Sequence, residues 1–84
     1  MDANGQKDQL AELISNAETS FYNGQLQEAF SLSLSAIKLD ENCADAYQCA
    51  ANVCMSLSRY EDAIEYYQKV QIYIMLITQI EMNL

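Results

Sequence analysis

Apolar residues recur at steps of three and four along four successive stretches of the chain. The first stretch begins near Lys7 and carries Leu10, Leu13, Ile14, Ala17 and Phe21. The other three stretches cover residues 26–39, 44–57 and 60–71. Because this spacing places side chains on one face of a helix, the pattern predicts four amphipathic helices and an all-α fold.

Turn residues separate the four stretches. Gly24 is suited to the left-handed conformation that follows a helix C-terminus. Asn42, after two acidic residues, is a candidate N-cap for the third helix. Ser58, with Glu61 three residues later, matches a capping box that starts the fourth helix. Short turns between helices of similar length predict two antiparallel helical hairpins.

The two predicted hairpins are related by a constant shift along the sequence. This shift places Leu13 on Tyr47, Ala17 on Ala51, Ala29 on Ala63, Phe30 on Ile64 and Ala36 on Val70. Only the two alanine pairs are identical, but the residue classes agree at the spaced positions. A 34-residue period of helix–turn–helix units, with small residues where helices cross, is typical of tetratricopeptide repeats.

Residues 60–69, Y-E-D-A-I-E-Y-Y-Q-K, resemble the consensus of that family most specifically. The chain resembles two tandem repeats, the first spanning about Leu10–Cys43 and the second beginning at Ala44. It departs from the family pattern at Glu41, where proline is usual, at Ser20 in place of tyrosine, and at Ser58 in place of glycine. The resemblance implies a short α-solenoid of two repeats over residues 7–71. It also implies a groove, formed by the first helix of each repeat, that holds an extended or helical peptide of a protein partner.

The resemblance further implies which residues face this groove. They are Ile14, Ser15, Glu18 and Tyr22 in the first repeat, and Gln48, Cys49, Asn52 and Ser56 in the second, with Met55 beside them. We take Ile14, Glu18, Tyr22, Gln48, Asn52 and Met55 as the predicted partner-binding residues of an adaptor or scaffold. The alternative for each is an ordinary solvated helix surface.

Some members of the family are co-chaperones that grip the C-terminal carboxylate of a heat-shock protein with lysine, asparagine and arginine. The corresponding positions here hold Ile14, Glu18 and Cys49. A carboxylate requires cationic or amide donors, and Glu18 would repel it. The carboxylate-clamp function is therefore disfavoured.

The charge of the chain limits its partners. Its 84 residues, enough for one small domain, include twelve acidic and four basic side chains, giving a net charge of −8. No basic surface is available to displace counterions from nucleic acid or to bind an anionic membrane. A basic peptide or protein partner is compatible with this charge, although acidic solvated faces also occur without any partner.

The residues of enzymes and metal sites are scarce. The chain has no histidine and no glycine-rich phosphate loop, which disfavours an enzyme. Three cysteines, Cys43, Cys49 and Cys54, are too few for a structural zinc site and are expected to be small buried thiols. We expect no cofactor and no metal. An odd number of cysteines and a polar N-terminus favour a cytoplasmic protein, with the nucleus left open.

Two segments lie outside the repeat pattern. Residues 1–6 are polar and are expected to be a disordered lead-in. Residues 72–84 form an apolar tail, Ile72–Leu84, which is too short and too interrupted to span a bilayer. The tail either caps the open end of the stack, or mediates self-association, or is the alternative end of a truncated form of a longer repeat protein. We favour the third origin, with a helical extension as its conformation. The alternatives to a scaffold are accordingly a self-associating helical module or a poorly functional truncated isoform.

Overall fold

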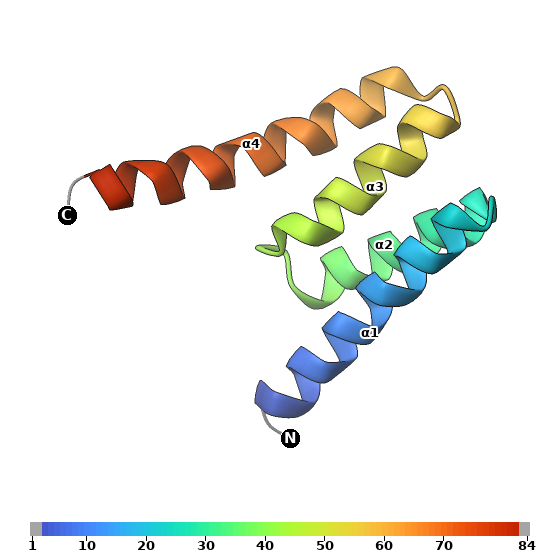
Figure 1. Ribbon diagram of the computed structural model, residues 1–84, viewed down its shortest axis with the longest axis horizontal. Helices are drawn as coiled ribbons and strands as arrows, with labels where there is room; N and C mark the ends of the chain where they lie inside the picture. Colours follow the sequence, from blue (N-terminus) through green and yellow to red (C-terminus); the bar gives the residue numbers. More distant parts are fainter. Residues whose placement is uncertain (1–2, 83–84) are drawn as a thin grey trace.

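A computed structural model describes residues 3–82, and this part of the chain contains four helices and no strand. They are α1 (Ala3–Tyr22), α2 (Leu26–Leu39), α3 (Ala44–Ser56) and α4 (Tyr60–Met82). Figure 1 shows each helix turning back on the one before it. The predicted all-α fold, with a C-terminal helical extension, is confirmed.

The helices pack as two hairpins, α1 against α2 and α3 against α4, and the hairpins meet where α3 packs on α2 (Figure 1). The repeat period also relates the boundaries of the elements. The start of α2 at Leu26 and that of α4 at Tyr60 are one period apart, as are the end of α1 at Tyr22 and that of α3 at Ser56. The 34-residue spacing expected from the sequence is therefore present at the turn inside each hairpin, whereas the outer ends of the helices do not follow it.

The turn after α1 has the hydrogen bonds of a Schellman motif. The Gly24 N–H donates to the Phe21 carbonyl at 3.1 Å, and the Gln25 N–H donates to the Ser20 carbonyl at 2.8 Å. Gly24 has a φ of 80°, in the left-handed region that glycine adopts without steric cost. The role expected for Gly24 is confirmed.

The turn after α3 repeats this geometry with a serine at the left-handed position. Ser58 has a φ of 60°, and its N–H donates to the Met55 carbonyl at 3.1 Å. The Arg59 N–H donates to the Cys54 carbonyl at 2.8 Å. A capping residue needs an extended backbone, so the expected capping box of Ser58 and Glu61 is wrong.

Two other expectations about helix starts also fail. Cys43 is the N-cap of α3, without a side-chain hydrogen bond, so Asn42 does not cap this helix. The Asn42 N–H instead donates to Asp40 Oδ1 at 2.9 Å, which closes the turn after α2. At the N-terminus, α1 already begins at Ala3, so residues 3–6 of the expected disordered lead-in are helical. Residues 1 and 2 lie outside the described part of the chain.

Small residues form most of the core. The alanines that are at most 1% exposed are Ala17, Ala29, Ala36, Ala46, Ala50, Ala51 and Ala63. Val53, Cys54 and Ser33 are the largest side chains that are fully buried. Small side chains let helix axes approach closely, so the packing depends on contact between backbones more than on large interlocking groups.

Tyr47 lies at the centre of a group of aromatic side chains between α3 and α4. Its ring lies 6.3 Å from the ring of Tyr66 and 6.3 Å from that of Tyr73, both on α4. The Lys69 ammonium nitrogen lies 5.6 Å from the centroid of the same ring. The Tyr47 hydroxyl donates to the Glu41 carbonyl at 2.8 Å, which ties α3 to the preceding loop.

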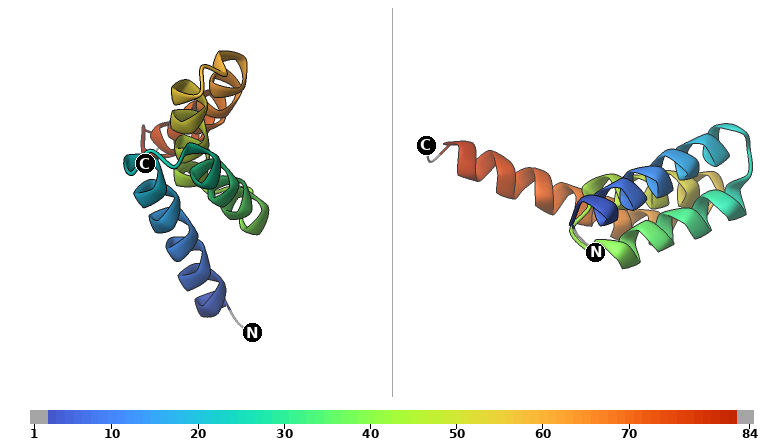
Figure 2. Two further views of the ribbon diagram at one scale, coloured as in Figure 1. Left: turned by 90° about the vertical axis from the view of Figure 1, so that its right-hand side faces the viewer. Right: turned by 90° about the horizontal axis from the view of Figure 1, so that it is seen from below.

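Residues 72–82 of the apolar tail continue α4 and leave the body of the molecule, as Figures 1 and 2 show. Residues 83 and 84 lie outside the described part of the chain. Its last polar contacts with the body come from Tyr73, whose hydroxyl lies 3.0 Å from the Glu41 carbonyl and 3.1 Å from Asn42 Oδ1. From Ile74 to Met82 the side chains are exposed. The tail therefore does not cover the open side of the stack. Among the described residues, no helix has the length and apolar character required to cross a bilayer.

Candidate functional site

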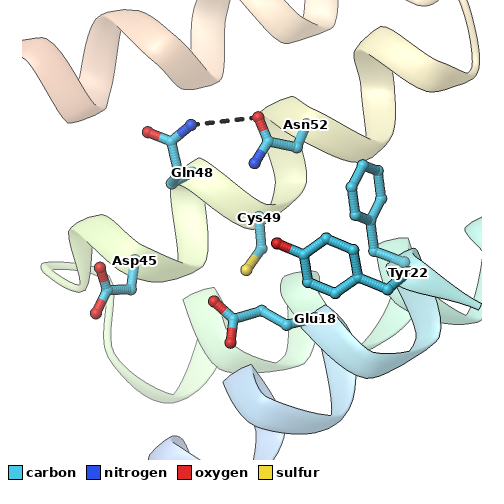
Figure 3. A pocket seen from close by; sticks show the side chains of 7 residues that line it. Glu18, Tyr22, Asp45, Gln48, Cys49 and Asn52 are labelled. Carbon is cyan, nitrogen blue, oxygen red and sulfur yellow. Dashed lines mark hydrogen bonds between the residues drawn. The ribbon is translucent and has the colours of Figure 1, made fainter.

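A small cleft lies between α1 and α3, the first helices of the two hairpins. Seven side chains line it: Glu18, Phe21 and Tyr22 from α1, and Asp45, Gln48, Cys49 and Asn52 from α3 (Figure 3). Its volume is about 70 Å³. Small-molecule sites usually measure roughly 300–1,000 Å³, so this cleft fits the end of one side chain rather than a whole ligand.

Four of the six predicted partner-binding residues, Glu18, Tyr22, Gln48 and Asn52, line this cleft. Cys49, another residue expected to face the groove, lines it as well. Ile14 and Met55 do not line the cleft: Ile14 is half-buried earlier on α1, and Met55 is 47% exposed beyond Asn52 on α3. Ser15 and Ser56 are exposed and also lie outside it.

Sequence reasoning missed two lining residues. Asp45 precedes Gln48 and Cys49 by three and four residues, so helical spacing alone places it on their face of α3. Phe21 was assigned only to the apolar stripe of the first helix. In the structure its ring packs edge-to-face on Tyr22, with 5.6 Å between centroids, and it forms part of the cleft wall.

The side chain of Asn52 is held in one orientation by two hydrogen bonds. The Tyr67 hydroxyl, from α4, donates to Asn52 Oδ1 at 2.7 Å, and Gln48 Nε2 donates to the same oxygen at 3.2 Å. Figure 3 shows the Asn52 amide nitrogen on the side that faces Cys49 and Tyr22. The carboxamide oxygen is thus saturated inside the protein, and the amide N–H groups are directed toward the cleft.

The cleft is electrostatically negative. Glu18 and Asp45 are both exposed, and no lysine or arginine of the described residues lines the cleft. Burial raises the pKa of the Cys49 thiol to about 11, and the carboxylates of Glu18 and Asp45 act in the same direction. A thiol with this pKa stays protonated at neutral pH, so Cys49 is poorly suited to act as a nucleophile there.

The described residues contain no cluster of three histidine, cysteine, aspartate or glutamate side chains that could hold a metal ion. The cleft presents the oriented amide of Asn52, the carboxylates of Glu18 and Asp45, and the aromatic rings of Phe21 and Tyr22.

No family model, curated protein or solved structure matches the chain.

Proposed function

We propose that this protein is an interaction scaffold of the tetratricopeptide-repeat type, and that the cleft between α1 and α3 binds an extended segment of a protein partner. The observation that carries the proposal is the fixed amide of Asn52. The Asn52 side-chain oxygen accepts hydrogen bonds from Tyr67 and Gln48, so the side chain already holds one rotamer, with its N–H groups toward the cleft, before a partner binds. Preorganisation of this kind lowers the entropic cost of binding.

The chemistry of the cleft favours a basic segment. An amide donor suits the backbone carbonyl of an extended peptide, because such carbonyls need a partner when they leave water. Glu18 and Asp45 on either side suit a lysine or arginine side chain of that segment. Tyr22, which is 83% exposed, offers an aromatic face beside them. The same two carboxylates disfavour the heat-shock carboxylate as a ligand.

Binding of short peptides tests the proposal directly. We compare three peptides of one sequence that differ only in a central lysine, alanine or glutamate, and measure affinity by fluorescence anisotropy. Each exposed ion pair contributes about 0.2–1 kcal/mol, so two such pairs should make the lysine peptide bind between about 2-fold and 30-fold more tightly than the alanine peptide. The glutamate peptide should bind most weakly.

Variants then locate the site. Glu18→Gln combined with Asp45→Asn should abolish the preference for lysine, whereas Glu65→Gln, an exposed carboxylate on α4, should leave it unchanged. Replacing Asn52 with alanine and Tyr22 with serine together should weaken all three peptides, with helicity preserved by circular dichroism. Equal binding of the three peptides, or affinity unaffected by these changes, would refute the proposed site.

A further inference from the structure

The side of α4 that packs on α3 carries apolar or small residues at alternating steps of three and four. We call these residues the α4 seam: Ala63, Tyr66, Val70, Tyr73, Ile77 and Ile80. The first four are buried or half-buried, and the rings of Tyr66 and Tyr73 lie against Tyr47 of α3. Ile77 and Ile80 are 57% and 62% exposed, and they lie where α4 has passed the N-terminal end of α3. This spacing is typical of a helix that packs along another helix, and here it continues past its intramolecular partner.

The α4 tail, residues 72–82, exposes an unusually large apolar surface. Seven side chains are between 52% and 80% exposed: Ile72, Ile74, Met75, Leu76, Ile77, Ile80 and Met82. Each exposes on the order of 100 Å² of mainly apolar surface. The total of about 700 Å² exceeds the largest apolar patch of a typical monomer, which is roughly 300–600 Å². A helix that is apolar on most of its sides is normally buried, so the tail requires a partner.

Charge indicates what that partner is. Glu81 is the only charged residue between Val70 and Met82, whereas the chain as a whole carries a charge of −8. An anionic membrane is a poor partner for the tail, because residues 70–82 contain no lysine or arginine. A second tail is apolar and almost uncharged. Antiparallel pairing of two tails also keeps the two acidic bodies at opposite ends, where their repulsion is weakest.

The repeat geometry argues against stacking of copies head to tail. α3, which packs on α2, buries Ala46 and Ala50 completely. The equivalent positions on α1, one repeat earlier, are Glu12 and Asn16, and both are exposed. Stacking the α1 of one copy on the α4 of another would bury these polar groups without partners. A two-fold arrangement avoids this cost, because each copy contributes the same apolar surface.

We propose that two copies of this chain associate through their α4 tails, packed antiparallel about a two-fold axis with Ile77 near its centre. One side of each tail would be covered, burying roughly 400 Å² per copy, which is the size of a weak and reversible interface. The dimer would present two clefts in one particle, so a partner with two binding segments would gain avidity. The pairing itself does not depend on what the cleft binds.

The oligomeric state of the full chain tests this inference. Sedimentation and light scattering over a dilution series should show a mass that rises toward twice the 9.5 kDa of the chain. Ile77→Glu should weaken dimerisation by at least about 100-fold, because two unpaired carboxylates would meet in the interface. Ile77→Lys alone should have the same effect. An equimolar mixture of these two variants should recover the dimer, because position 77 of one copy faces position 77 of the other.

A pair of double variants adds a matched control. Ile77→Glu combined with Ile80→Glu should abolish the dimer, and Met75→Glu combined with Gln79→Glu is its control. Both pairs add two charges, but helical periodicity places Met75 and Gln79 on the side of the tail opposite the seam. The control should still dimerise, with unchanged helicity by circular dichroism in both variants. A monomer at every concentration, equal disruption by both pairs, or no recovery in the mixture would overturn the proposal. Binding of the monomer to neutral phosphatidylcholine vesicles would assign the tail to a lipid surface instead.

Discussion

Ser58 occupies a backbone conformation that its counterpart in the first hairpin fills with glycine. Its φ is 60°, and that of Gly24, one repeat earlier, is 80°. A non-glycine residue in this region costs roughly 1–2 kcal/mol, while glycine loses about 0.5–1 kcal/mol more backbone entropy on folding. The Ser58 hydroxyl accepts only a long, exposed hydrogen bond of 3.4 Å from Tyr60, so little else is lost. Ser58→Gly should therefore stabilise the fold by about 0.5–1 kcal/mol.

The reverse change in the first hairpin is a matched control. A Cβ placed on Gly24 would meet no atom within 4 Å, so Gly24→Ser should cost only backbone strain, of the same size and opposite sign. Thermal unfolding followed by circular dichroism in the far ultraviolet measures both. In a domain of this size a change of about 1 kcal/mol shifts Tm by about 4–8 °C. The double variant should melt close to the parent, because the turns are separate. A Tm that is unchanged or lower in Ser58→Gly would refute this reasoning.

Three further changes probe the core, the cleft and the tail. Ala63→Leu should destabilise the fold by about 1–3 kcal/mol in urea unfolding, since Ala63 is 0% exposed, whereas Ala11→Leu on the exposed face of α1 should cost little. The pKa of Cys49 is raised from 9.0 to about 11, so the protonated thiol stabilises the fold below pH 9 and this contribution disappears as the pH rises to 11. Between pH 9 and 11 the urea midpoint of Cys49→Ala should therefore decline less than that of the parent protein. Tyr73→Phe removes two hydrogen bonds to the loop before α3 and should speed amide exchange in residues 74–82, leaving α1 unaffected. These expectations would be contradicted if the urea midpoint of Cys49→Ala fell more steeply between pH 9 and 11 than that of the parent. They would also be contradicted if amide exchange in residues 74–82 were unchanged in Tyr73→Phe.

The four helices could be predicted because helix formation depends on local spacing. Steps of three and four between apolar residues, together with breakers such as Gly24, define where helices run and where one of them ends. The repeat period also lies in the sequence, and the family resemblance implied that Glu18, Tyr22, Gln48 and Asn52 face one groove; all four line the cleft. Helical spacing explains why Glu18 and Tyr22 share one face of α1 and why Gln48 and Asn52 share one face of α3, but it does not place the two helices beside each other.

The helix ends were less predictable, because two local motifs competed for one residue. Ser58 with Glu61 fits a capping box, but the C-terminus of α3 requires a left-handed residue at the same position. The Schellman motif prevails here, and its two hydrogen bonds turn the chain into α4. Which motif forms depends on where the next helix must pack, and this is a property of the tertiary structure.

The sequence by itself thus determined the helical hairpins, their period and the acidic character of the molecule, since these follow from local patterns and composition. The tertiary structure alone decided the orientation of Asn52, because the hydroxyl that fixes it comes from Tyr67 on another helix. It also decided that Asp45 joins Glu18 at the cleft, across two helices. The apolar tail shows the same division. Its composition is local, but its exposure arises because α4 extends beyond the helix on which it packs.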